Sequence, residues 1–195
     1  MSETPAGPFN TVGNHLPWAA MTLDYTEQLA EAIPADLLDW SPGGGFFTPA
    51  EALMHIIDSR RLFARQLSGD TRTNDYYSAE YAHPDSLSGD WGFRGYGTMA
   101  DLLSALEDSR AELDAWLDQP AAILDQATPG TVSDFPRKLR YYQNSGLDPA
   151  GLEFRGPDTV TRVIMAVTVH EAAHRGNLQA VLRLRGVTIG PVPSP

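Results

Sequence analysis

The sequence predicts an all-α protein, a four-helix bundle with long connections that forms a single domain over residues 1–195. Three observations support this prediction. Four segments carry apolar residues at the spacing of amphipathic helices, no series of segments alternates as strands do, and two long connections, residues 69–97 and 120–158, separate the helices. Four such helices bury their apolar faces most simply against one another.

The first two helices are expected at residues 16–33 and 49–67. The second has a marked start, because Thr48 is placed to cap it, Pro49 takes the first helical position and Glu51 completes a capping box. The first ends near Pro34. A stripe of large side chains predicts its inner face: Leu16, Trp18, Met21, Tyr25, Leu29 and Ile33.

The third helix begins after Thr98, its expected N-cap, and stops at Pro120. The fourth covers residues 159–185 and ends at Gly186, a typical C-cap. A short β element is expected before it, at residues 152–154. Large apolar residues predict the inner face of the third helix: Leu102, Leu103, Leu106, Leu113, Trp116 and Leu117.

Composition restricts the function classes. The chain is 42% hydrophobic and 20% charged, as in ordinary globular proteins, and has no apolar stretch near the roughly 20 residues that span a bilayer. Its net charge of −11 argues against nucleic acid as a partner. The amino terminus shows no secretory signal, so we expect a cytoplasmic protein. Because there is no cysteine, any metal must be held by His, Asp or Glu.

The fourth helix contains the sequence HEAAH, in which His170 and His174 lie one turn apart on the expected apolar stripe. Two imidazoles at this spacing can bind one cation, although two core histidines bound to neighbours are the plainer interpretation. A metal would satisfy both rings at once and avoid the cost of burying unpaired polar groups. The sequence thus indicates half of a metal site.

HEAAH also matches the zinc-protease signature, in which Glu171 would be the general base. That mechanism needs a third ligand downstream, and the segment after His174 has no Asp, Glu or His. A zinc protease is therefore the weaker hypothesis. Glu171 lies about 100° around the helix from His170, and its simplest interpretation is a solvated or rim carboxylate.

The missing ligand must come from upstream, where three histidines are available. His15 precedes the first helix and His83 lies in the long connection, and both are expected to be exposed. His55 lies two turns into the second helix among apolar residues, so it can reach the bundle interior or be a satisfied core histidine.

Two segments then carry a family resemblance. WSPGGGFFTPAEAL followed by HIIDSRRLF, and VTVHEAAHRGNLQAVLRLRGV near the carboxyl end, resemble the DinB/YfiT-like family of metalloenzymes over residues 10–190. The resemblance implies a four-helix bundle in which His55, His170 and His174 hold a divalent ion, usually nickel or zinc. Asn177 stands where the family often has glutamine, outside the expected ligands.

The resemblance further implies a thiol-dependent S-transferase or isomerase that uses a low-molecular-weight thiol, with hydrolysis of a small molecule as the next hypothesis. Three neutral ligands leave open positions on a divalent ion, where water or a thiolate can bind. A non-catalytic metal-binding protein, serving stress sensing or partner binding, remains the alternative from another class. We also expect a homodimer and a small-molecule substrate.

Other residues around the expected site are less specific. Glu171 and Arg175 are the catalytic candidates, and Arg175 could steer an anionic substrate or pair with an acid. Asp58 and Asp24 could orient the imidazoles, although solvated surface acids are the plainer interpretation. Gly176 would permit close approach. Aromatic residues of the first long connection could form a lid or simply pack beneath it: Tyr76, Tyr77, Tyr81, Trp91, Phe93 and Tyr96.

Overall fold

The computed structural model describes residues 10–68, 98–128 and 159–187, and these residues form a helical bundle. Its four long helices are α2 (Pro17–Glu31), α3 (Pro49–Ser68), α5 (Met99–Leu117) and α7 (Val160–Leu184), with a short helix α1 (Val12–His15) before α2. Two 3-10 turns, η1 (Ala35–Leu37) and η3 (Ala121–Ile123), follow α2 and α5. The predicted all-α fold is confirmed, and the β element expected at residues 152–154 lies outside the described residues.

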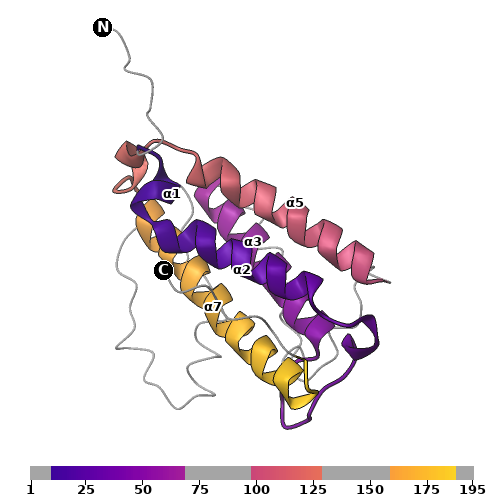
Figure 1. Ribbon diagram of the computed structural model, residues 1–195. Coiled ribbons are helices and arrows are strands. Elements are labelled where there is room, and N and C mark those ends of the chain that lie inside the picture. Colours follow the sequence, from indigo (N-terminus) through magenta and orange to yellow (C-terminus); the bar gives the residue numbers. More distant parts are fainter. Residues whose placement is uncertain (1–9, 69–97, 129–158, 188–195) are drawn as a thin grey trace, which may run out of the picture.

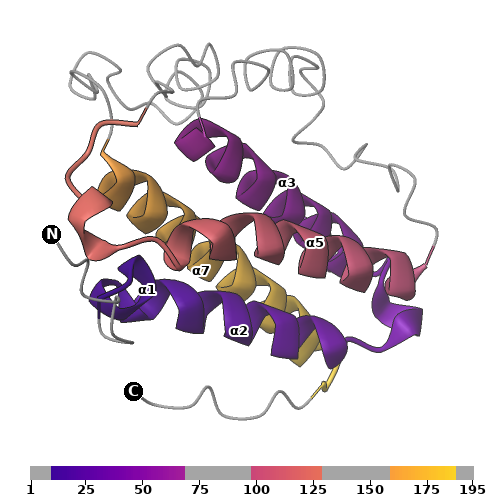
Figure 2. The same ribbon diagram turned by 90° about the horizontal axis from the view of Figure 1, so that it is seen from above.

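The four long helices run side by side along one axis (Figures 1 and 2). Helices α3 and α2 each pack against both α5 and α7, so α2 and α3 face each other across the bundle. Helices α3 and α7 are therefore neighbours. Their side chains can meet along the seam between them, both on its outer side and on its inner side toward the core.

Local signals in the sequence set the helix ends. At the start of α3, the Thr48 N–H donates to Glu51 Oε2 at 2.7 Å and the Glu51 N–H donates to Thr48 Oγ1 at 3.2 Å, which confirms the capping box. The Asp101 N–H donates to Thr98 Oγ1 at the start of α5. Gly186 ends α7 with φ +73, a conformation that favours glycine.

The buried face of α2 differs from the predicted stripe. Trp18 is 52% exposed, whereas Leu29 and Ile33 are buried as expected. Small side chains make up much of the face that packs inward, and a search for large apolar residues misses them: Ala19, Thr22, Leu23, Thr26, Leu29 and Ala30. On α5 the prediction holds better, since Leu102, Leu106, Leu113 and Leu117 are all buried.

The buried face of α7 is rotated relative to the predicted stripe. Val160, Val163 and Val167 are buried as expected, but Glu171, predicted to be solvated, is only 1% exposed, while His170 and His174 are half-buried at the edge of this face. The sequence prediction placed the histidines inward because positions 170 and 174 continue the stripe of valines, and it left Glu171 outside, where an unpaired carboxylate carries no burial cost. A partner from another helix removes that cost here.

Among the described residues the core has two apolar clusters, one toward each end of the bundle. One joins the end of α2 to the first half of α3 and the last turns of α7, and the other joins the beginning of α2 to the end of α3 and the first half of α7. Polar residues occupy the level between them, including the fully buried Arg60 and Glu171. The histidine cluster lies on the same stretch of α3 and α7.

Candidate metal centre

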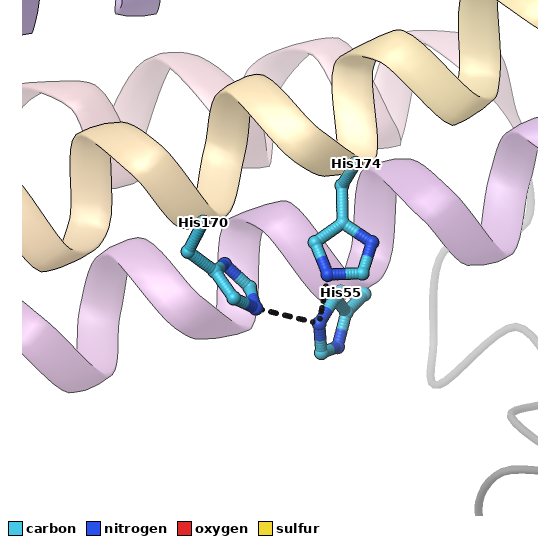
Figure 3. Close-up of side chains that lie close together, drawn as sticks. All are labelled: His55, His170 and His174. Carbon is cyan, nitrogen blue, oxygen red and sulfur yellow. Dashed lines mark hydrogen bonds between the residues drawn. The ribbon is translucent and has the colours of Figure 1, made fainter. Parts of the chain in front are cut away.

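Three histidines from two helices converge at the α3–α7 seam (Figure 3). His55 comes from the second turn of α3, and His170 and His174 come from successive turns of α7. The His55 Nε2 atom lies 3.1 Å from the Nε2 atoms of both His170 and His174. If each histidine offers one ring nitrogen as a ligand, the three nitrogens all lie within 4.8 Å of one another. The structure thus brings the three predicted ligands together.

The rings are held by their helices and by aromatic neighbours. The four-residue spacing on α7 places the centroids of His170 and His174 4.4 Å apart. Phe47, in the loop before α3, lies 5.7 Å from the His55 ring and 6.0 Å from the His174 ring, centroid to centroid. Phe63, two turns further along α3, lies 6.4 Å from His170. The imidazoles therefore stand between apolar walls.

The nitrogen separations suit a divalent metal ion. Imidazole nitrogens bind zinc at about 2.0 to 2.1 Å, so two ligands at tetrahedral or octahedral angles lie about 2.8 to 3.4 Å apart. The two separations from His55 Nε2, 3.1 Å each, fall within this interval. Burial also lowers the pKa of His174, which favours the neutral ring that serves as a ligand. The three-histidine group can hold a divalent ion.

Glu171 does not take the place of a protease general base. Its Oε2 atom accepts from Arg60 Nε at 2.8 Å and its Oε1 atom accepts from Arg60 Nη2 at 2.7 Å, deep in the bundle. A zinc protease needs this carboxylate beside the metal, free to take a proton from water. The interpretation of Glu171 as a solvated acid is wrong because Arg60, a residue not singled out from the sequence, compensates its buried charge.

The guanidinium of Arg175 packs against α2, whereas an anion-steering residue would be expected to face solvent. Its Nη1 atom donates to the Thr22 carbonyl on α2 at 2.6 Å, and its guanidinium lies 5.4 Å from the centroid of the Tyr25 ring. These contacts join α7 to α2. A role for Arg175 toward substrate stays a prediction.

The two acids considered as orienting residues differ from each other. Asp58 is only 8% exposed, so its interpretation as a solvated surface acid is wrong. Asp24 is exposed as expected and pairs with Arg110 at 2.7 Å, in a surface group on α2 and α5. His15 is exposed, as predicted. His83 and the aromatic residues between 76 and 96 lie outside the described residues.

A pocket of about 230 Å³ opens beside the triad, and His174 forms part of its wall. The glycine loop before α3 contributes Gly44, Gly45 and Phe47, and the next turns of α7 contribute Asn177 and Val181. Gly44 and Gly45 have φ values of +68 and +83, which side chains rarely allow, so the loop depends on glycine. Apart from His174 and Asn177, the described lining is apolar or glycine.

The sequence contains two weak signals for the features that were not predicted, the Arg60–Glu171 ion pair and the glycine loop beside the pocket. Arg60 and Glu171 are charged residues on two helices that also carry apolar stripes, and a pair of opposite charges on two helices of a bundle can be matched across the core. The glycine run at residues 43–45 marks a special loop just before the helix that carries His55. Neither signal names a partner without the tertiary arrangement.

Fold and site together define a helical-bundle protein with a three-histidine group able to hold a divalent metal ion. A sequence profile of the DinB superfamily matches residues 20–178, and the chain belongs to this superfamily. The match includes all three histidines, and it confirms the resemblance carried by the second and fourth helices. No curated protein and no solved structure matches the chain. Among the described helices, none is long and apolar enough to cross a membrane.

Proposed function

We propose that this protein is a metal-dependent enzyme in which His55, His170 and His174 hold a divalent ion, nickel or zinc, and which joins a low-molecular-weight thiol to a small electrophile. The observation that carries the proposal is the convergence of three imidazoles beside an open pocket, with the Nε2 atom of His55 3.1 Å from the Nε2 atoms of His170 and His174. A divalent ion at this position would lower the pKa of a bound thiol and polarise an electrophile.

The pocket supports turnover over a purely structural metal site. Structural sites are closed by four protein ligands, whereas the described part of the chain brings three together and has a cavity against one of them. The thiol must come from outside, because the chain has no cysteine. Homodimer formation and a small-molecule substrate belong to the same proposal.

The pocket also favours one kind of substrate. Phe47 and Val181 offer apolar walls, Asn177 offers one amide, and no acid, lysine or arginine takes part in the described lining. An uncharged electrophile with a short apolar group fits this lining, since burying a charge there would leave the charge uncompensated. Hydrolysis of the same class of molecule is the second candidate, because water and a thiol can use the same open position.

The test is a panel of low-molecular-weight thiols and uncharged electrophiles, with purified protein loaded with nickel or zinc. We expect metal-dependent loss of free thiol, abolished in His55→Ala and unchanged in His15→Ala, whose histidine is exposed on α1. Parallel assays for ester and amide hydrolysis separate the second candidate. If the protein binds metal but consumes neither thiol nor hydrolysable substrate above the His55→Ala background, the enzyme proposal fails and the non-catalytic alternative stands.

A further inference from the structure

A buried ion pair crosses the same two helices as the histidines. Arg60 of α3 and Glu171 of α7 are joined by two hydrogen bonds of 2.7 and 2.8 Å, and their side chains are 0% and 2% exposed. Two parallel bonds between a guanidinium and a carboxylate fix direction as well as distance. The pair therefore sets how α3 and α7 are rotated against each other.

Arg60 extends this restraint to the whole bundle. Its Nη1 atom donates to Glu27 Oε1 on α2 and to the Leu106 carbonyl on α5, each at 3.2 Å, and its Nη2 atom donates to the Leu23 carbonyl on α2 at 3.4 Å. With the two bonds to Glu171, all five N–H groups of the guanidinium have acceptors. One side chain thus ties the four long helices together at one level.

This level coincides with the metal-binding residues. Glu171 follows His170 directly and precedes His174 by three residues, and Arg60 lies five residues after His55. The ion pair is fully buried while the histidines are half-buried, so the two groups occupy the inner and outer sides of one helix seam. Figure 3 shows the outer group, with the three rings meeting between α3 and α7.

The three histidines do not hold α3 and α7 in position by themselves, so another contact must fix the rotation of the two helices. The Nε2 atom of His55 lies 3.1 Å from the Nε2 atoms of His170 and His174, so unprotonated rings bring lone pairs together, and only a proton or a cation between them makes the contacts favourable. A side-chain tip lies about 5 to 6 Å from its helix axis, so a rotation of about 10° moves it by about 1 Å. Metal–ligand distances tolerate only about 0.2 Å.

We propose that Arg60 and Glu171 are positioning residues that fix the geometry of the three-histidine site. The glutamate of the HEAAH sequence thereby serves the metal from the inner side of the seam, through Arg60, rather than as a base acting on a bound water. This inference rests on the proposed metal site but not on the proposed reaction, so it is tested by metal binding and not by turnover.

The experiment titrates each purified variant with Co²⁺, an ion that imidazole ligands accept, and records the dissociation constant and the visible absorption bands. The variants are Arg60→Met, Arg60→Lys and Glu171→Gln. Arg110→Met is the control, because Arg110, although less buried than Arg60, also pairs with several carboxylates, and all of these lie on α2 and α5: Asp24, Glu27 and Asp114. Circular dichroism confirms the helical fold of each variant before titration.

We expect Arg60→Met and Glu171→Gln to raise the Co²⁺ dissociation constant tenfold or more and to alter the absorption bands. Arg60→Lys should recover part of the affinity, and Arg110→Met should match the wild type. If Arg60→Met does not fold, Glu171→Gln and Arg60→Lys carry the test, because they keep the side-chain length or volume.

Two results with the variants overturn the inference. In the first, folded Arg60 and Glu171 variants bind Co²⁺ with wild-type affinity and spectrum. In the second, Arg110→Met weakens binding as much as they do, so that general loss of stability explains the effect. A wild-type protein that binds no Co²⁺ overturns the metal site itself, and the inference with it, whereas inactivity of a protein that binds Co²⁺ normally refutes the proposed reaction alone.

Discussion

Replacing His55 by alanine tests the metal site through folding stability. His55 is the one member of the triad that α3 provides, and the other two lie on α7. In the wild type an ion bound by the triad would join two helices that are distant in sequence. In His55→Ala it can bind only a pair on a single helix, which also forms in partly unfolded chains, so binding no longer favours the folded state strongly.

The magnitude follows from linkage. At a free metal concentration about 100-fold above the dissociation constant, binding to the folded state alone raises the free energy of unfolding by about 2.7 kcal/mol. In a domain of this size each kcal/mol shifts the midpoint of thermal unfolding by roughly 2 to 4 °C. We therefore expect metal to raise the wild-type midpoint by about 5 to 11 °C, and to raise that of His55→Ala by a small fraction of this.

Without metal, the substitution should change stability little. His55 is half-buried and its ring lies against Phe47 at 5.7 Å, so some packing is lost. The removal of His55 Nε2 also relieves its two contacts of 3.1 Å with the Nε2 atoms of His170 and His174. The two effects oppose each other, and we expect a net change of about 1 kcal/mol or less.

The assay is thermal unfolding followed by far-ultraviolet circular dichroism, with and without nickel or zinc. His15→Ala is the control, because His15 is exposed on α1 and lies outside the triad, and it should keep the full metal-induced shift. The reasoning is refuted if His55→Ala keeps that shift too, since metal would then be binding somewhere else.

Three further outcomes follow from the fold. Thr48→Ala removes the capping box at the start of α3 and should lower the free energy of unfolding by about 1 kcal/mol in chemical denaturation, with Glu51→Gln, which can still bond back, costing less. Leu113→Ala, at a side chain that is 2% exposed, should cost about 2 to 5 kcal/mol, and a cost below 1 kcal/mol would mean that this part of the core is not packed as described. Burial is the main effect on the Glu27 carboxyl and raises its pKa, although the charges of Arg60 and Arg110 oppose this, so folding disfavours the charged form. Glu27→Gln should therefore lower the free energy of unfolding at neutral pH by less than Glu171→Gln does. The reverse order in urea titrations would contradict this.

The sequence predicted the helices well because their limits depend on neighbouring residues. Thr48 with Glu51, Thr98 and Gly186 act within one or two turns, and the structure has each helix beginning or ending beside them. The histidine pair of α7 was also local, since residues four apart must share a face. The connections at residues 69–97 and 129–158 lie outside the described residues, so the predictions made for them stay predictions.

The third ligand required more than spacing. His55 was one of three upstream candidates, and it was favoured by its place among apolar residues of the second helix and then by the family resemblance. The structure brings its ring to His170 and His174, because α3 and α7 are neighbours in the bundle. The sequences of α3 and α7, taken separately, do not predict that these two helices pack together.

The sequence by itself determined the helices, their ends and the pair of imidazoles on α7, since each depends on residues within a few turns. Only the tertiary structure decided which face of α7 is buried. Hydrophobicity placed Glu171 outside, yet Arg60 from α3 draws it into the core with two short hydrogen bonds. The physical reason is that the cost of burying a charge depends on its partner, and that partner lies 111 residues away in the chain.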